Sequence, residues 1–205
     1  EDVDDAIVWG YTGGPKVPPG TYTARLAVAD GDTLTQSLEV RMDPRIENVT
    51  GADLRAQYNL ATEVRDTTNA IYDAIRTLRS VREQVTTVAQ HASEAGHDGL
   101  TAQADSLSER LTSLEQDLMQ TKNESFQDPL NFPPQLDNQY AYLYGYVAGP
   151  DGPPTEQART RFRDLNEVWM DHRAQLQEML DTALPRFNEQ VRQLNSQPVF
   201  VPTLD

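Results

Sequence analysis

The sequence predicts a mainly helical protein: an antiparallel helical bundle of three to four helices, two of them long, preceded by a small β segment. Residues 1–45 consist of short β-branched runs separated by Gly- and Pro-rich turns, whereas residues 46–205 repeat apolar side chains every three or four positions. These periods are typical of strands and of amphipathic helices, respectively. The change falls at residues 42–45, so we expect the last strands of a β-sandwich-like domain at 1–45 and the helical bundle at 46–205.

The β part is predicted to contain a hairpin. Residues 21–28 and 35–42 alternate apolar and polar side chains, and Asp30-Gly31-Asp32 between them tolerates the positive φ of a tight turn. Residues 6–9, Ala-Ile-Val-Trp, are predicted to form a further short strand. The hairpin looks like the last one of an immunoglobulin- or fibronectin-like sandwich, a fold of about seven strands. We therefore expect the chain to be the C-terminal piece of a larger protein.

Two helices are predicted to follow. The first begins near Thr50, which can cap it, has Asp53 near the positive end of the helix dipole, and ends before Gly96. About 40 residues at 1.5 Å each make a rod of about 60 Å. The second, near 99–123, carries a heptad-like stripe that is the strongest periodic pattern in the chain. Its members are Leu100, Ala104, Leu107, Leu111, Leu114, Leu118 and Thr121.

A short third helix and a second long helix are predicted in the last part. The prolines of the preceding connector favour a helix start, which gives a helix near 136–147. The alternating tyrosines at 140–146 favour a strand instead, so both structures stay open there. Thr155 is expected to cap the long helix, which continues to about residue 195. It should kink at Pro185, because proline lacks the N–H that the helical ladder needs.

The composition limits the partners. The chain has 32 acidic and 17 basic side chains, a formal net charge of −15, and only two lysines. Such a surface repels phosphate backbones and anionic headgroups, which argues against nucleic acid and against a membrane surface as partners. The acid excess is typical either of a halophile or of an ordinary acidic, soluble surface. The absence of cysteine excludes disulfides and thiolate metal sites.

Four segments carry a resemblance to a known family. They are Pro-Pro-Gly-Thr-Tyr at 18–22, Thr-Gln-Ser-Leu-Glu-Val at 35–40 with Asp-Pro-Arg at 43–45, Asp53-Leu54 with Gln57, and Asp-Pro-Leu-Asn-Phe-Pro at 128–133. In this order they resemble the C-terminal region of bacterial sortilin-type β-propeller proteins, whose BNR repeats are often labelled glycosyl hydrolase. The resemblance implies an upstream β-propeller of the same protein as partner and a secreted or periplasmic location in a bacterium. None of these segments is catalytic.

One feature could contact a ligand or a partner, a row of tyrosines: Tyr140, Tyr142, Tyr144 and Tyr146. Exposed tyrosines stack on sugar faces or anchor a partner protein. Core packing with the hydroxyls reaching solvent is the favoured interpretation of the row. The stretch departs from the aliphatic residues that are usual at this place in the resembled family.

The remaining chemistry-bearing residues are interpreted as structural. His91 and His97 flank the end of the first helix, where a cationic histidine is favoured, and are expected to be surface residues rather than metal ligands. His172 falls on the inner stripe of the last helix and is interpreted as a hydrogen-bonded core or boundary residue. Three carboxylate pairs are interpreted as solvated helix faces: Glu63 with Asp66, Glu115 with Asp117, and Glu178 with Asp181.

The sequence therefore predicts a non-catalytic accessory module, structural or protein-interacting, with no catalytic, cofactor-binding or metal-binding residues. Two alternatives stay open. The first is a carbohydrate-binding appendage of a glycoside hydrolase that uses the tyrosines or the β face. The second is a helical dimerisation element built on the leucine stripe of the second helix.

Overall fold

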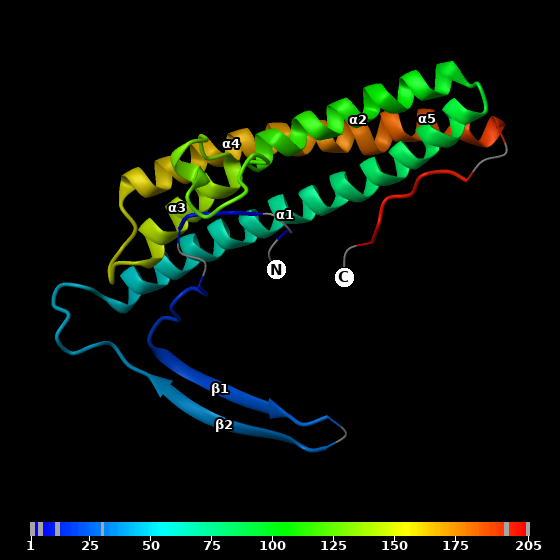
Figure 1. Cartoon of the computed structure of the whole chain (residues 1–205). Helices are drawn as coiled ribbons and strands as arrows, with labels where there is room; N and C mark the ends of the chain where they lie inside the picture. The colour runs from blue at the N-terminus through cyan, green and yellow to red at the C-terminus, as the bar shows by residue number, and fades with distance from the viewer. Residues whose placement is uncertain (1–2, 4–5, 11–12, 30, 195–196, 204–205) are drawn as a thin grey trace.

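A computed structural model describes residues 3, 6–10, 13–29, 31–194 and 197–203 of the chain (Figure 1). The described part is mainly helical with one small sheet, which confirms the predicted class. The elements are β1 (Gly20–Ala27), β2 (Thr33–Val40), α1 (Gly51–Glu94), α2 (Asp98–Leu118), a 3₁₀ turn (Asp128–Leu130), α3 (Leu136–Ala148), α4 (Glu156–Glu178), a π-helical turn (Met179–Ala183) and α5 (Leu184–Gln193).

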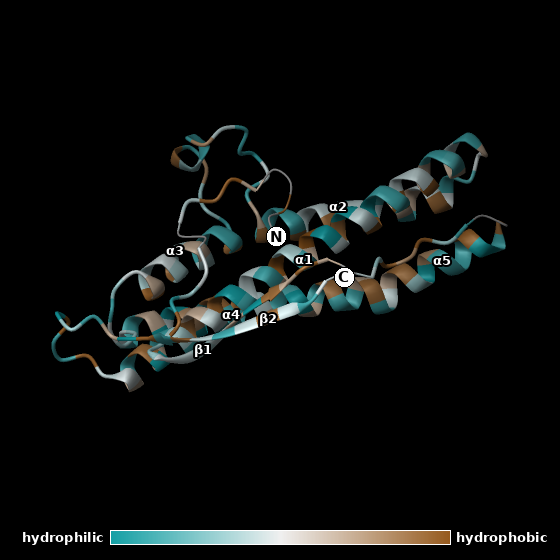
Figure 2. Cartoon of the chain, turned by 90° about the horizontal axis from the view of Figure 1, so that it is seen from below, coloured by the Kyte–Doolittle hydropathy of each residue, from teal (hydrophilic) through white to brown (hydrophobic). Residues whose placement is uncertain are grey.

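The long helix α1 forms the axis of the bundle. The antiparallel helix α2 returns along the C-terminal half of α1, and the short α3 covers its N-terminal half (Figure 1). Helices α4 and α5 form one nearly continuous rod that runs in the direction of α1. Apolar and hydrophilic patches alternate along each long helix (Figure 2), and the apolar stripes meet in one core. Burial of these stripes holds the bundle together, because isolated helices draw little stability from propensity alone.

The start of α1 agrees with the prediction. Thr50 is the N-cap: its hydroxyl accepts a hydrogen bond from the Asp53 amide at 3.2 Å, and its own amide donates to the Asp53 carboxylate at 2.8 Å. This reciprocal capping box satisfies two of the amides that a helix start leaves unpaired. The Asp53 carboxylate also accepts a hydrogen bond from the Thr50 hydroxyl at 2.7 Å, and this bond, with the one from the Thr50 amide, holds the pKa of Asp53 below its usual value.

Helix α2 ends earlier than predicted, at Leu118 instead of near residue 123. Met119 leaves the helix in an extended conformation and is buried, with 1% of its surface exposed. The side chain of Gln120 then donates a hydrogen bond to the Pro133 carbonyl at 3.0 Å. Core burial and this contact with the connector therefore stop a helix that the periodic pattern would continue.

The third helix resolves the alternative between helix and strand, since residues 136–148 are helical. Thr155 caps α4 through a hydrogen bond from the Ala158 amide, as predicted. A π-helical turn lies just before Pro185, the position of the predicted kink, and there the Leu184 amide donates to the Met179 carbonyl five residues earlier. A π turn accommodates the missing proline donor without ending the rod. The predicted end near Asn195 lies outside the described residues.

The predicted hairpin is present, and it is the only sheet among the described residues. In the described part of the chain β1 pairs only with β2, in an antiparallel register that sets Tyr22 opposite Leu38 and Leu26 opposite Leu34. Asp30, part of the predicted turn, lies outside the described residues. The predicted strand at residues 6–9 was wrong: this segment lies along the bundle without strand pairing.

Side-chain amides take the place of a strand partner for the N-terminal segment. Asn138 of α3 donates to the Trp9 carbonyl at 2.5 Å, and the Trp9 amide donates back to the Asn138 side chain at 3.4 Å. Asn123 donates to the Ile7 carbonyl at 3.3 Å, and the Trp9 indole N–H donates to the Phe126 carbonyl at 2.7 Å. These bonds satisfy backbone groups that would otherwise be costly to place against the bundle.

Replacing Gly10 with alanine is expected to destabilise this segment. Gly10 has φ +148°, and a Cβ there would lie 2.8 Å from backbone atoms of Ala141 in α3. We expect the free energy of unfolding to fall by more than about 1 kcal/mol, measured by chemical denaturation. Gly14→Ala is the matched control, since a Cβ at Gly14 meets nothing within 4 Å. Equal stability of the two variants would show that the segment is not docked as described.

Candidate functional site

The predicted row of tyrosines is divided between two sides of α3. Tyr140 and Tyr144 face the core, with 0% and 5% of their surface exposed, whereas Tyr142 and Tyr146 are exposed by 47% and 61%. The helical period of 3.6 residues causes this split, because positions 140 and 144 lie on one face and positions 142 and 146 lie on another. The structure therefore brings together two candidate contact residues, not four.

Tyr140 and Tyr144 pack in the core, but the hydroxyl of Tyr140 does not reach solvent as predicted. Its ring meets that of Phe162 edge to face at 6.3 Å, and its hydroxyl is buried without a hydrogen-bond partner in the described structure. Burial raises the pKa of Tyr140 above its usual value. The exposed pair, Tyr142 and Tyr146, is one turn apart and presents two aromatic faces to solvent.

A second candidate is the outer face of the hairpin. One face of β1 and β2 carries the cross-strand pair Leu26 and Leu34, which are 60% and 62% exposed. Val28 and Leu38 extend the apolar surface. In Figure 1 the hairpin lies apart from the bundle, joined to it by the segments before β1 and after β2. We call this projecting hairpin, residues 20–40, the arm.

The base of the arm is fixed to the bundle where α3 and α4 meet. Lys16 donates to the Gly149 carbonyl at 3.2 Å and to the Asp151 carboxylate at 3.0 Å. The buried Gln57 of α1 donates to the carbonyl of Val147 at 2.8 Å and also to that of Pro150. A cavity of about 140 Å³ between Val17, Met42 and Leu54 separates the arm base from α1. The arm is therefore fixed to the bundle at its base, and its apolar face is uncovered.

The histidines occupy two different environments. His91 and His97 are both exposed, and both line one cavity of about 380 Å³ between the C-terminal half of α1, α2 and the C-terminal tail. In the described part of the chain no three His, Asp or Glu side chains come together as a metal site. His172 is half-buried at the edge of the core, and its Nδ1 atom is buried without a hydrogen-bond partner among the described residues.

One carboxylate interpretation was wrong, because Glu115 is not on a solvated face. Only 3% of its surface is exposed, and its two oxygens contact Arg79 Nε at 2.6 Å and Arg82 Nη1. Arg82 also donates to the Thr112 hydroxyl at 3.2 Å. The sequence offers no signal for this triad, since Glu115 comes from α2 and both arginines come from α1. Its partner in the predicted pair, Asp117, is exposed, as are the other two pairs.

Asp137 is a buried acid in the first turn of α3, with 2% of its surface exposed. Its carboxylate accepts a hydrogen bond from the Asn138 amide at 2.6 Å. Burial nevertheless dominates and raises the pKa of Asp137 to about 7. A buried acid with a raised pKa is a candidate functional group wherever a cleft accompanies it. The cavities of about 380, 800, 140 and 840 Å³ among the described residues are lined by other side chains than Asp137.

Asp137→Asn is expected to change how stability depends on pH. The folded protein keeps a proton on Asp137 up to about pH 7, whereas the unfolded chain releases it near its ordinary pKa of 3.8, so this group destabilises the fold as pH rises between these values. We expect the variant to gain stability over the wild type across this window, by up to about 1.4 kcal/mol per pH unit, and the difference to level off above pH 7. Chemical denaturation from pH 4 to 8 measures it. A constant difference would mean that Asp137 is ionised in the fold.

A comparison of the chain with protein-family models, with curated proteins and with solved structures found no match. Among the described residues, no helix combines the length and the apolar character needed to cross a lipid bilayer. The candidate functional features of the chain are the arm, the exposed tyrosines and the surfaces of the bundle.

Proposed function

We propose that the chain is a non-catalytic accessory module whose arm docks onto a preceding β domain of the same protein, while the helical bundle acts as its support. The observation that carries the proposal is the uncovered apolar face of β1 and β2. A two-stranded hairpin alone is marginally stable in water, and it needs further strands or a packed face for stability. The side chains of Leu26 and Leu34 have no such cover in the described chain.

The geometry of the arm is better suited to docking onto another domain than to catalysis. The free edges of a two-stranded sheet offer backbone groups to a further strand, and the apolar face offers a surface to bury. The resemblance to sortilin-type proteins suggests an upstream β-propeller, with its adjoining β domain, as the partner and a secreted or periplasmic bacterial location. The buried acids Glu115 and Asp137 have structural surroundings, since the first is held by two arginines and the second accepts a hydrogen bond from the neighbouring Asn138 amide.

Docking is tested with the protein region encoded upstream, produced separately and titrated with the chain in a calorimeter. We expect binding, and we expect the double variant Leu26→Asp, Leu34→Asp to lose at least about tenfold in affinity, because it places charge in a surface that must be desolvated. Leu130→Asp is the matched control, since Leu130 is 72% exposed but lies outside the arm. Unchanged affinity of the arm variant would show that the arm does not take part in the interface.

The lack of catalysis is tested separately. The chain should not hydrolyse aryl glycosides, because the carboxylates that line the cavities of about 800 and 840 Å³ are either exposed, as Asp98 and Glu189 are, or held by two arginines, as Glu115 is. Turnover that disappears on substitution of one carboxylate would contradict a non-catalytic role.

A carbohydrate-binding role is the second candidate, and the exposure of Tyr142 and Tyr146 is the observation that favours it. A glycan array with the wild type and with the double variant Tyr142→Ala, Tyr146→Ala tests it, since stacking requires the exposed rings. Glycan binding that disappears in the variant would assign a sugar-binding role to the exposed face of α3. The leucine stripe of α2 gives no support to dimerisation, because Leu100, Leu107, Leu111, Leu114 and Leu118 are buried within this chain.

A further inference from the structure

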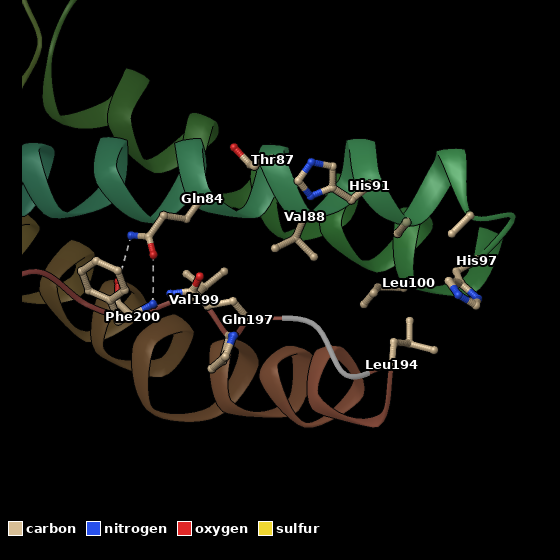
Figure 3. A pocket seen from close by; sticks show the side chains of 13 residues that line it. Gln84, Thr87, Val88, His91, His97, Leu100, Leu194, Gln197, Val199 and Phe200 are labelled. Atoms are coloured by element: carbon tan, nitrogen blue, oxygen red, sulfur yellow. Dashed lines mark hydrogen bonds between the residues drawn. The ribbon is translucent and has the colours of Figure 1, made fainter.

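The C-terminal tail, residues 197–203, lies in a groove between α1 and α5 (Figure 3). Two side-chain amides hold its backbone from opposite sides. Asn188 of α5 donates to the Val199 carbonyl and accepts from the Val199 amide, both at 2.7 Å. Gln84 of α1 makes the same pair of bonds with Phe200, both at 3.0 Å.

These two pairs of hydrogen bonds indicate that the groove binds the backbone of a peptide segment. In an extended chain the N–H and C=O of one residue point to the same side, and those of the next residue point to the other side. Asn188 and Gln84 therefore bind two consecutive residues of the segment through their backbone N–H and C=O groups alone. Among the tail residues that the structure describes, only Val199 is buried, with 5% of its surface exposed, whereas Phe200 is 63% exposed.

The groove is larger than the tail that occupies it. The cavity of about 380 Å³ continues along it from Val199, and Figure 3 shows the apolar side chains of Val88, Leu100 and Leu194 around the opening. This volume falls within the range of ordinary ligand pockets. Gln197 lines the cavity but is exposed. A residue at position 197 therefore borders the part of the cavity that the tail leaves unfilled.

We propose that this groove is a binding site for an extended apolar peptide segment of a partner protein, and that the tail is its resident substitute. The partner carries a β-branched residue in the place of Val199 and a large aliphatic residue in the place of Gln197. The main-chain bonds to Gln84 and Asn188 are available to any extended segment. The aliphatic residue fills the cavity that the exposed Gln197 leaves empty. The partner segment therefore binds the groove more tightly than the tail does.

A partner segment needs this higher affinity, because the tail of the same chain competes with it for the groove. A tethered segment acts at an effective concentration of the order of millimolar. A partner without additional contacts would therefore be excluded at ordinary concentrations. Burial of a leucine side chain in the cavity is expected to improve binding by at least about tenfold over the tail sequence.

The test uses the full chain with Val199→Asp, which weakens the resident tail and leaves the groove residues unchanged. Two fluorescent peptides are titrated: Gln-Pro-Val-Phe-Val-Pro, the tail sequence, and Leu-Pro-Val-Phe-Val-Pro. We expect the leucine peptide to bind at least about tenfold more tightly in fluorescence anisotropy. Adding Gln84→Ala and Asn188→Ala should remove binding of both peptides, with the helical circular dichroism of the bundle retained.

A second measurement avoids any dependence on the Val199→Asp variant. In the otherwise unchanged chain, Gln197→Leu should raise the hydrogen-exchange protection of the Val199 amide by about tenfold, because the tail itself then fills the cavity. Gln175→Leu is the matched control: it adds the same side chain to an exposed position of α4 outside the cavities and should leave that protection unchanged.

Two results would overturn the proposal. Equal affinity of the two peptides, with no added protection in Gln197→Leu, would show that the cavity does not select an aliphatic residue. A dimer formed when the wild type is mixed with the Val199→Asp variant, detected by light scattering, would show that the groove exchanges tails between copies of this chain and is not a site for another protein.

Discussion

Replacement of Leu111 by alanine is expected to lower the free energy of unfolding by about 2–5 kcal/mol. Leu111 has 0% of its surface exposed and lies in the middle of the α2 stripe, which packs mainly on α1. The loss combines the transfer of a buried side chain with the cavity that remains, and a closely packed core relaxes only in part. Urea denaturation with a common slope for wild type and variant measures the change.

Leu114 provides an internal check and Leu130 a control for this prediction. Leu114 is 2% exposed on the same stripe, so Leu114→Ala should cost a similar amount. Leu130 is 72% exposed, and Leu130→Ala should change stability by less than about 0.5 kcal/mol. A cost below about 1 kcal/mol at Leu111 would mean that α2 is peripheral to the cooperative core.

Glu115→Gln is the second substitution for which we expect a large effect, about 3 kcal/mol, the lower end of the range for breaking a buried ion pair. The substitution removes the anion that Arg79 and Arg82 share between α1 and α2. Both arginine side chains keep 27% exposure, and water therefore offsets part of the loss. Chemical denaturation at neutral pH measures the effect.

The matched control for Glu115 is Glu178→Gln. Glu178 also pairs with an arginine of another helix, Arg110, but the two side chains are 50% and 48% exposed. An ion pair in that setting contributes about 0–1 kcal/mol. Equal costs for Glu115→Gln and Glu178→Gln would show that burial of the Arg79–Glu115–Arg82 triad is not what gives it its strength.

Added salt should separate the two pairs further. Exposed charges are screened over about 3 Å at 1 M salt, whereas a charge enclosed between two helices is reached much less. The cost of Glu115→Gln should therefore persist at 1 M salt, while that of Glu178→Gln should vanish.

The sequence by itself determined the local structure of the chain. The start of α1 at Thr50 and the start of α4 at Thr155 both follow from backbone chemistry within a few residues. The leucine stripe of α2 likewise identified the buried face, because amphipathic periodicity is a property of consecutive residues. The hairpin followed from alternation in the same way.

The tertiary structure alone decided which surfaces are available for function. Tyr142 and Tyr146 became exposed while Tyr140 and Tyr144 became buried, because α3 formed a helix where alternation had also allowed a strand. Glu115 became part of a buried triad because α2 lies beside two arginines more than 30 residues away.

The terminal segments depend on tertiary structure for the same reason. Asn138 holds the N-terminal segment at Trp9, and Gln84 and Asn188 hold the tail at Phe200 and Val199. These bonds join residues up to 129 positions apart, and a single amide side chain carries no pattern that reveals its partner. Local sequence therefore fixed the helices, whereas the packing of distant segments decided the groove, the triad and the uncovered arm.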